Sequence, residues 1–317
     1  MGRTASFFRV FAILMTVLLG APRLAAAAPA ETPPLVTPAW LRAHLHDKGL
    51  IVIEVYLLDQ NRETYEKGHI PGAIFTGFFS DGWIRTSGDE IPGLLPPQDK
   101  IDAILGGLGV TPESRVVLVP GGVGLSRPNT FDASTWLYWA LNAEGAHQVS
   151  ILNGGDDGWR AAEADAIETG SVKPSTSHFA GSLQPGYQAR LADVEAAVKA
   201  REPLLVDSRP PEQFAGKIKT AAVTRAGTLP GAVNLPAQDL MTPNGQGMIP
   251  EDQVKQRIAA AGIKPGAAAI VFCNNSYLAS SDWFALRAIA GHDKVLLYSG
   301  SMAEWTRHPD LPVVAGP

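Results

Sequence analysis

Short runs of β-branched and other apolar residues recur along the chain, and glycine, proline or polar residues bound each run. Runs of this length are typical of strands that are buried on both faces of a sheet. Stretches with helical periodicity lie between them. The predicted strands are Leu50–Val55, Val116–Val119, Val149–Leu152, Leu204–Val206, Ala269–Phe272 and Val295–Tyr298. The predicted helices are Pro38–His46, Gln98–Gly106, Ser134–Ala143, Ala192–Ala200, Pro250–Ala260 and Ser281–Ala290. This alternation predicts an α/β fold of parallel sheets with helices on both faces.

Three pairs of segments recur in the same order in the two halves of the chain, which predicts a tandem duplication. Gly68–Ala73 corresponds to Gly227–Ala232, Ala133–Leu137 to Ser280–Phe284, and Leu152–Trp159 to Tyr298–Trp305. The separation falls from 159 residues for the first pair to 147 and 146 for the others. The first half therefore carries a net insertion, part of which we expect near Pro120–Asp132.

The repeat divides the chain into two predicted domains, residues 34–170 and residues 188–314. Residues 171–187 between them are rich in Ser, Thr, Pro and Gly and lack an apolar period, so they are predicted to be a linker. Residues 1–28 differ in kind, because arginines precede the apolar run Val10–Leu19 and a run of alanines follows it. That order is typical of a secretory signal peptide, and the run is shorter than the ~20 residues of a membrane-spanning helix. We expect a periplasmic or secreted mature protein with no stable membrane insertion after signal cleavage.

Composition excludes several kinds of partner and site. The 317 residues include 26 Lys and Arg against 31 Asp and Glu, and no basic run is present, so a nucleic-acid partner is not expected. The seven histidines show no zinc-binding spacing. The single cysteine, Cys273, cannot form an internal disulfide and is therefore either inert or reactive.

Cys273 directly follows the predicted strand Ala269–Phe272, and a short loop leads from it to a helix that begins near Ser280. Ligands of parallel α/β folds bind at the carboxyl ends of the strands. A loop at this place can turn backbone N–H groups inward, stabilise a thiolate or bound anion, and lower the pKa of the cysteine. The alternative is that Cys273 is a buried small hydrophobe, the usual state of a free cysteine. Its position between strand and helix favours the reactive interpretation.

These motifs together resemble the tandem rhodanese-like sulfurtransferases, which include thiosulfate and 3-mercaptopyruvate sulfurtransferases. The resemblance covers nearly all of the predicted mature chain. In the second half it rests on Asp207-Ser208-Arg209, Leu229–Asn234, Cys273 at the head of its loop, and Leu297–Ser301 with Glu304-Trp305. In the first half it rests on Gly68–Ala73 and on Leu152–Gly155 with Trp159–Ala162.

The resemblance implies sulfur transfer in two steps through a persulfide on Cys273. The thiolate would take a sulfane sulfur from a donor such as thiosulfate or 3-mercaptopyruvate and pass it to a thiol or cyanide-like acceptor. The loop would bind the terminal sulfur through its N–H groups, and no metal or organic cofactor would be required. The residues implied in substrate binding are Asn274, Asn275, Ser276, Tyr277, Leu278 and Ala279.

The first half has Pro120–Gly124 where the second has Cys273 and its loop, and it contains no cysteine. The resemblance implies that this half is inactive and closes one side of a site between the domains. Glu54 stands at the place of the family's usual aspartate and His69 matches the histidine of its motif. Each either faces the cleft or serves local hydrogen bonding and a turn.

For Arg209, a buried pair with Asp207 is favoured over substrate contact. The tryptophans predicted to be core or interface residues are Trp159, Trp283 and Trp305.

Several residues depart from the family's pattern. Asn274-Asn275 matches neither the cationic residues that follow the cysteine in thiosulfate-type loops nor the Gly-Ser of mercaptopyruvate-type loops. Gln213 stands where the family has a substrate-binding arginine. The nearby cations Lys217, Lys219 and Arg225 either supply the missing charge or are ordinary solvated surface.

Four further positions within the loop also bear on function. Ser276 replaces a common glycine, which costs strain if that position needs a positive φ. Tyr277 and Leu278 are candidates to line the donor pocket. Ala279 occupies the place of the arginine that a cysteine phosphatase of the related fold requires, which argues against phosphatase activity. The remaining alternative is a non-catalytic rhodanese-like binding module. The sequence fixes neither donor, acceptor nor oligomeric state.

Overall fold

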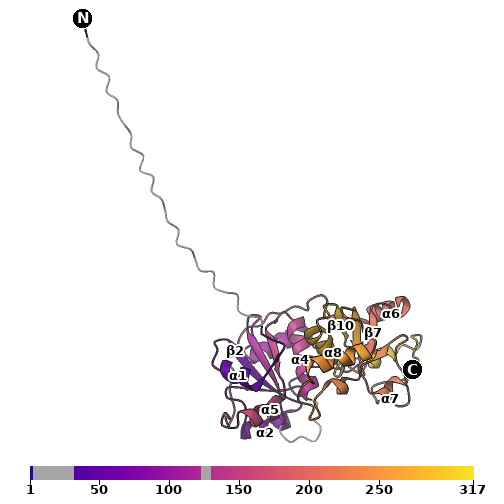
Figure 1. The fold of residues 1–317 in the computed structure, drawn as a ribbon, viewed down its shortest axis with the longest axis horizontal. Coiled ribbons are helices and arrows are strands. Elements are labelled where there is room, and N and C mark those ends of the chain that lie inside the picture. The colour runs from indigo at the N-terminus through magenta and orange to yellow at the C-terminus, as the bar shows by residue number, and fades with distance from the viewer. Residues whose placement is uncertain (3–31, 123–129) are drawn as a thin grey trace. The chain divides into compact units, whose positions relative to one another are not determined.

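The computed structural model describes residues 1–2, 32–122 and 130–317 (Figure 1). Residues 3–28 of the predicted signal peptide and residues 123–129 of the expected insertion lie outside the described residues. The first half is drawn from indigo to magenta, and the second from orange to yellow.

Each half contains one five-stranded parallel sheet, and the two sheets have the same topology. The first has the order β1 (Leu35–Val36), β5 (Val149–Leu152), β4 (Arg115–Pro120), β2 (Leu50–Tyr56) and β3 (Ile74–Gly77). The second has the order β6 (Gln188–Ala189), β10 (Val295–Tyr298), β9 (Ala269–Phe272), β7 (Leu204–Asp207) and β8 (Val233–Asn234). Helices cover sheets of this kind on both faces, which explains why the central strands are continuous runs of Val, Ile and Leu. The predicted α/β fold and the tandem duplication are confirmed.

The helices stand where the periodicity predicts them, with several short ones in addition. In the first half they are α1 (Pro38–His44), η1 (Asp59–Asn61), α2 (Arg62–Lys67), α3 (Gln98–Gly107), α4 (Thr130–Ala143) and α5 (Gly155–Ala162). In the second half they are α6 (Leu191–Ala200), α7 (Pro211–Phe214), η2 (Ala237–Leu240), α8 (Glu251–Ala260), α9 (Ala279–Phe284), the π-helical turn η3 (Ala285–Ile289) and α10 (Ser301–Trp305). The longest, α4, has 14 residues. Within 32–122 and 130–317, no helix combines the length and the apolar character needed to cross a membrane.

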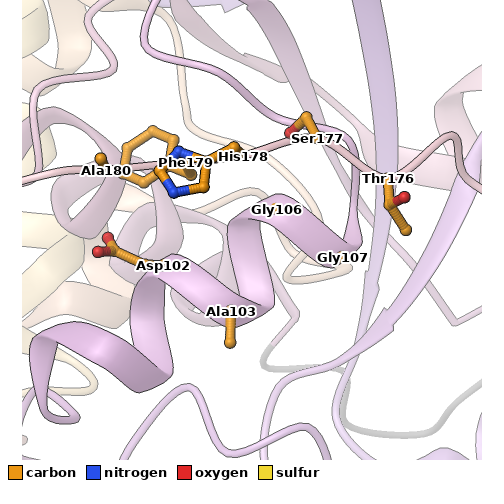
Figure 2. Close-up of a pocket in the computed structure, with 9 residues that line it drawn as sticks. All are labelled: Asp102, Ala103, Gly106, Gly107, Thr176, Ser177, His178, Phe179 and Ala180. Atoms are coloured by element: carbon orange, nitrogen blue, oxygen red, sulfur yellow. The ribbon is translucent and has the colours of Figure 1, made fainter.

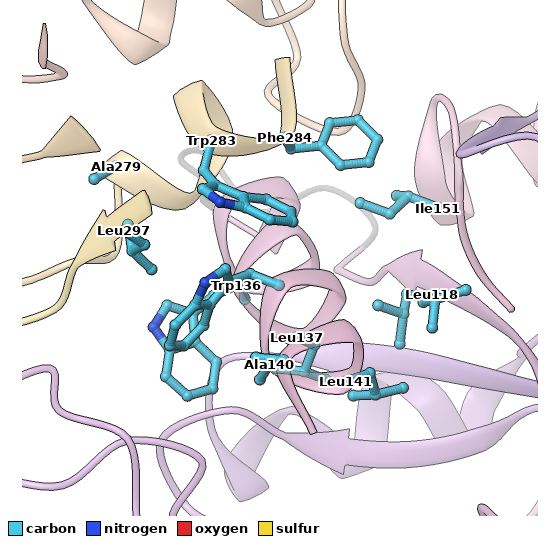
Figure 3. Packing of buried hydrophobic residues seen from close by; sticks show 14 of the residues in the cluster. Leu118, Trp136, Leu137, Ala140, Leu141, Ile151, Ala279, Trp283, Phe284 and Leu297 are labelled. Atoms are coloured by element: carbon cyan, nitrogen blue, oxygen red, sulfur yellow. The ribbon is translucent and has the colours of Figure 1, made fainter. Parts of the chain in front are cut away.

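One hydrophobic cluster includes buried residues of both halves, and helices α4 and α9 pack against each other within it. Figure 3 shows Trp283 and Phe284 of α9 together with Trp136 of α4. The Phe284 ring makes an edge contact with Tyr138 at 4.8 Å between ring centroids. Trp159, Trp283 and Trp305 are each buried, as predicted. Cys273 belongs to the same cluster, so the nucleophile candidate lies where the two halves meet.

One loop segment of each half packs against the other half. The first-half cover segment, residues 85–94, is closed by an antiparallel bridge between Arg85 and Leu94 and contacts the loop that carries Cys273. The second-half cover segment, residues 241–248, is closed by a bridge between Met241 and Met248. It contacts the first half through hydrogen bonds between the Met248 backbone and the Asn153 side chain. The two covers follow β3 and β8, so they are equivalent parts of the repeat.

Candidate active site

The cysteine loop, residues 273–279, runs from the end of β9 to the start of α9, and its base is tied to α10. The Cys273 N–H donates to the Ser301 hydroxyl at 3.1 Å, and its carbonyl accepts from the Met302 N–H at 3.0 Å. The same Ser301 hydroxyl accepts from the Ser276 N–H at 3.1 Å and donates to the Tyr298 carbonyl at 2.8 Å. One buried hydroxyl therefore holds the loop at two points against the end of β10.

The backbone N–H groups of Asn275, Ala279 and Leu278 lie near enough to the Cys273 sulfur to act on the ionisation of its thiol. Burial nevertheless raises the pKa of the Cys273 thiol, the three N–H groups lower it, and the Asp207 carboxylate raises it again. The expectation of a lowered pKa was wrong, because removing a fully buried thiolate from water outweighs the donors that remain around it.

Ser276 adopts the conformation for which a glycine would be expected. Its φ is 76°, and its side chain is fully buried. The Ser276 hydroxyl donates to the Gly93 carbonyl of the first-half cover segment at 2.7 Å. It also accepts from the Trp136 indole N–H of α4 at 3.1 Å. The strain predicted for this position is present, and groups of the first half hold the residue there.

The other loop side chains have distinct surroundings. Asn274 donates its amide N–H to the Gln213 side-chain oxygen at 2.9 Å, so the two neutral departures from the family pattern contact each other. The Tyr277 ring lies 5.4 Å from Phe78 and 6.0 Å from Phe79 of the first half, and burial raises the pKa of its hydroxyl. Leu278 is half-buried, and Ala279 begins α9 one residue earlier than expected.

The cations near Gln213 are mostly bound to backbone groups. Lys219 donates to the Val223 carbonyl at 3.0 Å. Arg225 donates to the carbonyls of Leu311 at 2.8 Å and His308 at 2.9 Å, among others. Arg225 and Lys219 therefore hold loops of the second half together, while Lys217 is exposed.

Arg209 forms a buried pair with Asp207, as the sequence favours. Its guanidinium donates to the two carboxylate oxygens at 2.8 and 2.6 Å and to the Gly227 carbonyl at 2.8 Å. Both side chains are fully buried. A buried pair with these additional hydrogen bonds is an internal brace between β7 and the Gly227–Ala232 turn.

Glu54 and His69 make local contacts in the first half. The Glu54 carboxylate accepts from the Ile70 N–H at 2.8 Å and from the Tyr56 hydroxyl at 3.2 Å. Burial, and then the nearby Asp156 carboxylate, raise the pKa of Glu54 to about 8. The His69 ring stacks on Tyr65 at 4.1 Å, with its Nδ1 3.1 Å from the Tyr65 carbonyl oxygen. These contacts agree with the local hydrogen-bonding interpretation of both residues.

The second-half cover segment fills the corresponding place in the first half. Gln246 is fully buried; its side-chain oxygen accepts from the Asp157 N–H at 3.1 Å, and its side-chain N–H donates to the Gly122 carbonyl at 3.5 Å. Sequence reasoning missed Gln246, Gly93, Trp136 and Ser301. Of these, Trp136 and Ser301 belong to segments that the repeat singles out, Ala133–Leu137 and Tyr298–Trp305, whereas Gln246 and Gly93 do not.

A separate cavity of about 400 Å³ lies between α3 and the linker residues Thr176–Ala180 (Figure 2). Asp102 and His178 are among the residues that line it. None of its lining residues belongs to the cysteine loop.

Comparison with known proteins agrees with this architecture. Residues 37–162 and 190–308 each match the rhodanese-like domain family. A thiosulfate sulfurtransferase from Pseudomonas aeruginosa is 30% identical over 292 residues, covering 89% of this chain and 97% of that protein. A putative thiosulfate sulfurtransferase from Haloferax volcanii is 30% identical over 293 residues, covering 89% of this chain and 96% of that protein.

Two solved structures share the fold. SseA from Escherichia coli, a 3-mercaptopyruvate sulfotransferase, superposes with a TM-score of 0.69 at 25% identity and covers 85% of this chain and 99% of its own. The anaerobic ergothioneine biosynthesis enzyme from Chlorobium limicola superposes with a TM-score of 0.76 at 20% identity, covering 90% of this chain and 70% of its own. The chain therefore belongs to the rhodanese family, as a tandem of two rhodanese-like domains of which only the second carries a cysteine.

Proposed function

We propose that this chain is a sulfurtransferase that moves a sulfane sulfur from a donor such as thiosulfate or 3-mercaptopyruvate to a thiol or cyanide-like acceptor. One observation carries the proposal: the only cysteine of the chain directly follows β9, at the head of the loop that leads into α9. The family membership and the sulfurtransferases among its relatives support the same function.

The proposed reaction has two steps, and both take place at the Cys273 sulfur. With thiosulfate, the Cys273 thiolate attacks the outer sulfur, the S–S bond of the donor breaks, and sulfite leaves with the bonding electron pair. The product is a persulfide whose terminal sulfur carries one negative charge. An acceptor nucleophile then attacks this terminal sulfur, and the Cys273 thiolate leaves with the electrons of the S–S bond.

The backbone N–H groups near the Cys273 sulfur are suited to the charged stages of this cycle. They present fixed dipoles to the negative sulfur of both the thiolate and the persulfide, in the way that an oxyanion hole binds oxygen. Because the donors are backbone groups, they need no charged side chain. The side chains of Asn274 and Gln213 are neutral, and they favour neither thiosulfate nor 3-mercaptopyruvate as the sulfur donor.

The test is the intact mass of the purified protein after exposure to thiosulfate or to 3-mercaptopyruvate, with Cys273→Ser as the matched control. We expect a gain of one sulfur atom that cyanide removes and that the variant lacks. Because the chain has no second cysteine, the variant leaves no other thiol to load. The donor that produces the adduct identifies the substrate.

A non-catalytic rhodanese-like binding module is the competing function, and it would have to be argued from the burial of the cysteine. Cys273 has no exposed surface, and burial raises the pKa of its thiol. If neither donor loads a reduced Cys273, this second function becomes the better account of the chain.

The proposal includes export of the protein. The arginines that precede the apolar run Val10–Leu19, and the alanines that follow it, support removal of residues 1–28 and a periplasmic or secreted mature enzyme.

A further inference from the structure

We propose that Ser276 is a positioning residue through which the cysteine-free first half sets the geometry of the cysteine loop and the reactivity of Cys273. The kinetic part of this inference rests on the proposed sulfurtransferase function. The part that concerns ionisation of the thiol does not.

Ser276 is held by four hydrogen bonds, which together use all of its polar groups. Within the second half, its N–H donates to the Ser301 hydroxyl at 3.1 Å, and its carbonyl accepts from the Ser280 N–H at 3.1 Å. Across the interface, its hydroxyl donates to the Gly93 carbonyl at 2.7 Å and accepts from the Trp136 indole at 3.1 Å. The hydroxyl is therefore committed entirely to the first half.

The backbone of Ser276 is in a conformation that it does not favour by itself. A φ of 76° lies in the left-handed region, where a residue with a Cβ is strained and glycine is not. Contacts that surround such a residue must hold it there. The two bonds from the first half are suited to this, because they act on a fully buried side chain.

The groups that hold the hydroxyl are themselves fixed. Trp136 is fully buried on α4, with its ring 5.5 Å from Phe78 and 5.4 Å from Trp139. Gly93 lies so close to the loop that a Cβ on it would be 1.8 Å from the Asn275 carbonyl oxygen. The first half therefore presents one rigid donor and one rigid acceptor to Ser276.

Ser276 stands between the N–H groups that lie near the Cys273 sulfur. Asn275 precedes it, while Leu278 and Ala279 follow it within three residues. If the hydroxyl is released, the backbone on both sides can rotate, and donors turn away from the sulfur. The thiolate and the persulfide then lose stabilisation, while the thiol does not.

The decisive variant is Ser276→Gly, because glycine adopts the required φ without strain and the variant should fold. We expect the thiolate to form at higher pH than in the unmodified chain and persulfide loading to slow about tenfold, the loss of roughly one hydrogen bond to a charged group. The ionisation is followed by the ultraviolet absorbance of the thiolate, with Cys273→Ser subtracted. The single cysteine makes that signal unambiguous.

Trp136→Phe tests the route through the first half. It should slow loading in the unmodified chain and have no further effect in the Ser276→Gly background. Trp159→Phe is the matched control, because the buried Trp159 indole lies on α5 in a different hydrophobic cluster and donates to the Ala166 carbonyl, at 2.9 Å. It should change neither loading nor the titration.

Two results would overturn the inference. One is a folded Ser276→Gly variant whose thiol titration is unchanged, which would mean that the residue serves only to adopt its φ. The other is an equal effect of Trp136→Phe in both backgrounds, which would mean that Trp136 acts through packing alone. A chain that no donor loads would count against the proposed function, yet the titration would still decide the role of Ser276.

Discussion

Gly93 is the position at which the contact between the two halves can be tested most directly by one substitution. Its φ is +82°, and a Cβ placed there would lie 1.8 Å from the carbonyl oxygen of Asn275 and 2.7 Å from its carbonyl carbon. Both atoms belong to backbone, so no side-chain rotation relieves the overlap. In Gly93→Ala the first-half cover segment must move away from the cysteine loop by more than an ångström.

The cost of this substitution has three parts. Alanine in the left-handed region costs about 1 kcal/mol. Loss of the hydrogen bond from the Ser276 hydroxyl to the Gly93 carbonyl costs roughly another 1 kcal/mol, and opening the packed contact costs a similar amount. We therefore expect a loss of about 3 kcal/mol in the free energy of unfolding, together with persulfide loading that is about tenfold slower.

Gly82→Ala is the matched control. Gly82 has the same φ of +82°, but its Cβ would meet only the flexible end of the Lys100 side chain, at 3.3 Å. We expect a loss of about 1 kcal/mol and unchanged loading. The assays are urea denaturation followed by tryptophan fluorescence, and intact-mass kinetics of loading. If the two variants lose equal stability and load equally fast, the cover segment does not bear on the cysteine loop, and the reasoning fails.

Three further predictions concern the anchor of the cysteine loop, a buried carboxyl group and the signal peptide. Ser301→Ala removes the acceptor shared by the N–H groups of Cys273 and Ser276, so stability should fall by about 2 kcal/mol and loading by more than tenfold; wild-type kinetics would contradict the anchoring role. Burial raises the pKa of Asp132 from 3.8 to about 7, so the folded state retains a proton that the unfolded state loses, and stability should fall as pH rises between about 4 and 7. Asp132→Asn has no such proton, so the free energy of unfolding of this variant should fall less over the same pH range, by up to about 4 kcal/mol. Denaturation at a series of pH values measures the difference, and equal pH dependence in the two proteins would refute the assignment. Protein recovered from the periplasm or medium should have lost residues 1–28, and a mass that includes them would contradict signal cleavage.

The long elements could be predicted from the sequence because their signal is local. Continuous apolar runs predicted strands such as β4 and β9, and the repeat of motifs predicted two sheets of the same topology. The strands β1, β6 and β8 were missed, since each has only two residues and no period can be recognised in so short a segment. The four-residue strand β3 at the edge of the first sheet was missed as well. The predicted helix after the cysteine loop is present, but it changes to a π-helical turn at Ala285.

The site could be predicted only in part: contacts between residues that are close in the sequence were predicted, and contacts between distant residues were not. The place of Cys273, the strain at Ser276 and the buried Asp207–Arg209 pair depend on neighbours along the chain, and all three predictions are confirmed. The hydrogen bond from the Trp136 indole to the Ser276 hydroxyl joins residues that are 140 positions apart, and one sequence does not reveal such a contact. The pKa of Cys273 was predicted in the wrong direction for the same reason, because the depth of burial depends on the whole interface.

Each half contacts the other through an equivalent cover segment, but the two contacts differ in kind. The first-half cover segment contacts the cysteine loop of the second half through the backbone at Gly93, and backbone N–H groups lie beside the Cys273 sulfur. In the first half, the equivalent cover inserts the Gln246 side chain, whose amide bonds Asp157 and Gly122. A buried amide that satisfies backbone groups forms a fixed contact. The first half can then serve as a rigid support, and a rigid support is what a strained residue such as Ser276 requires.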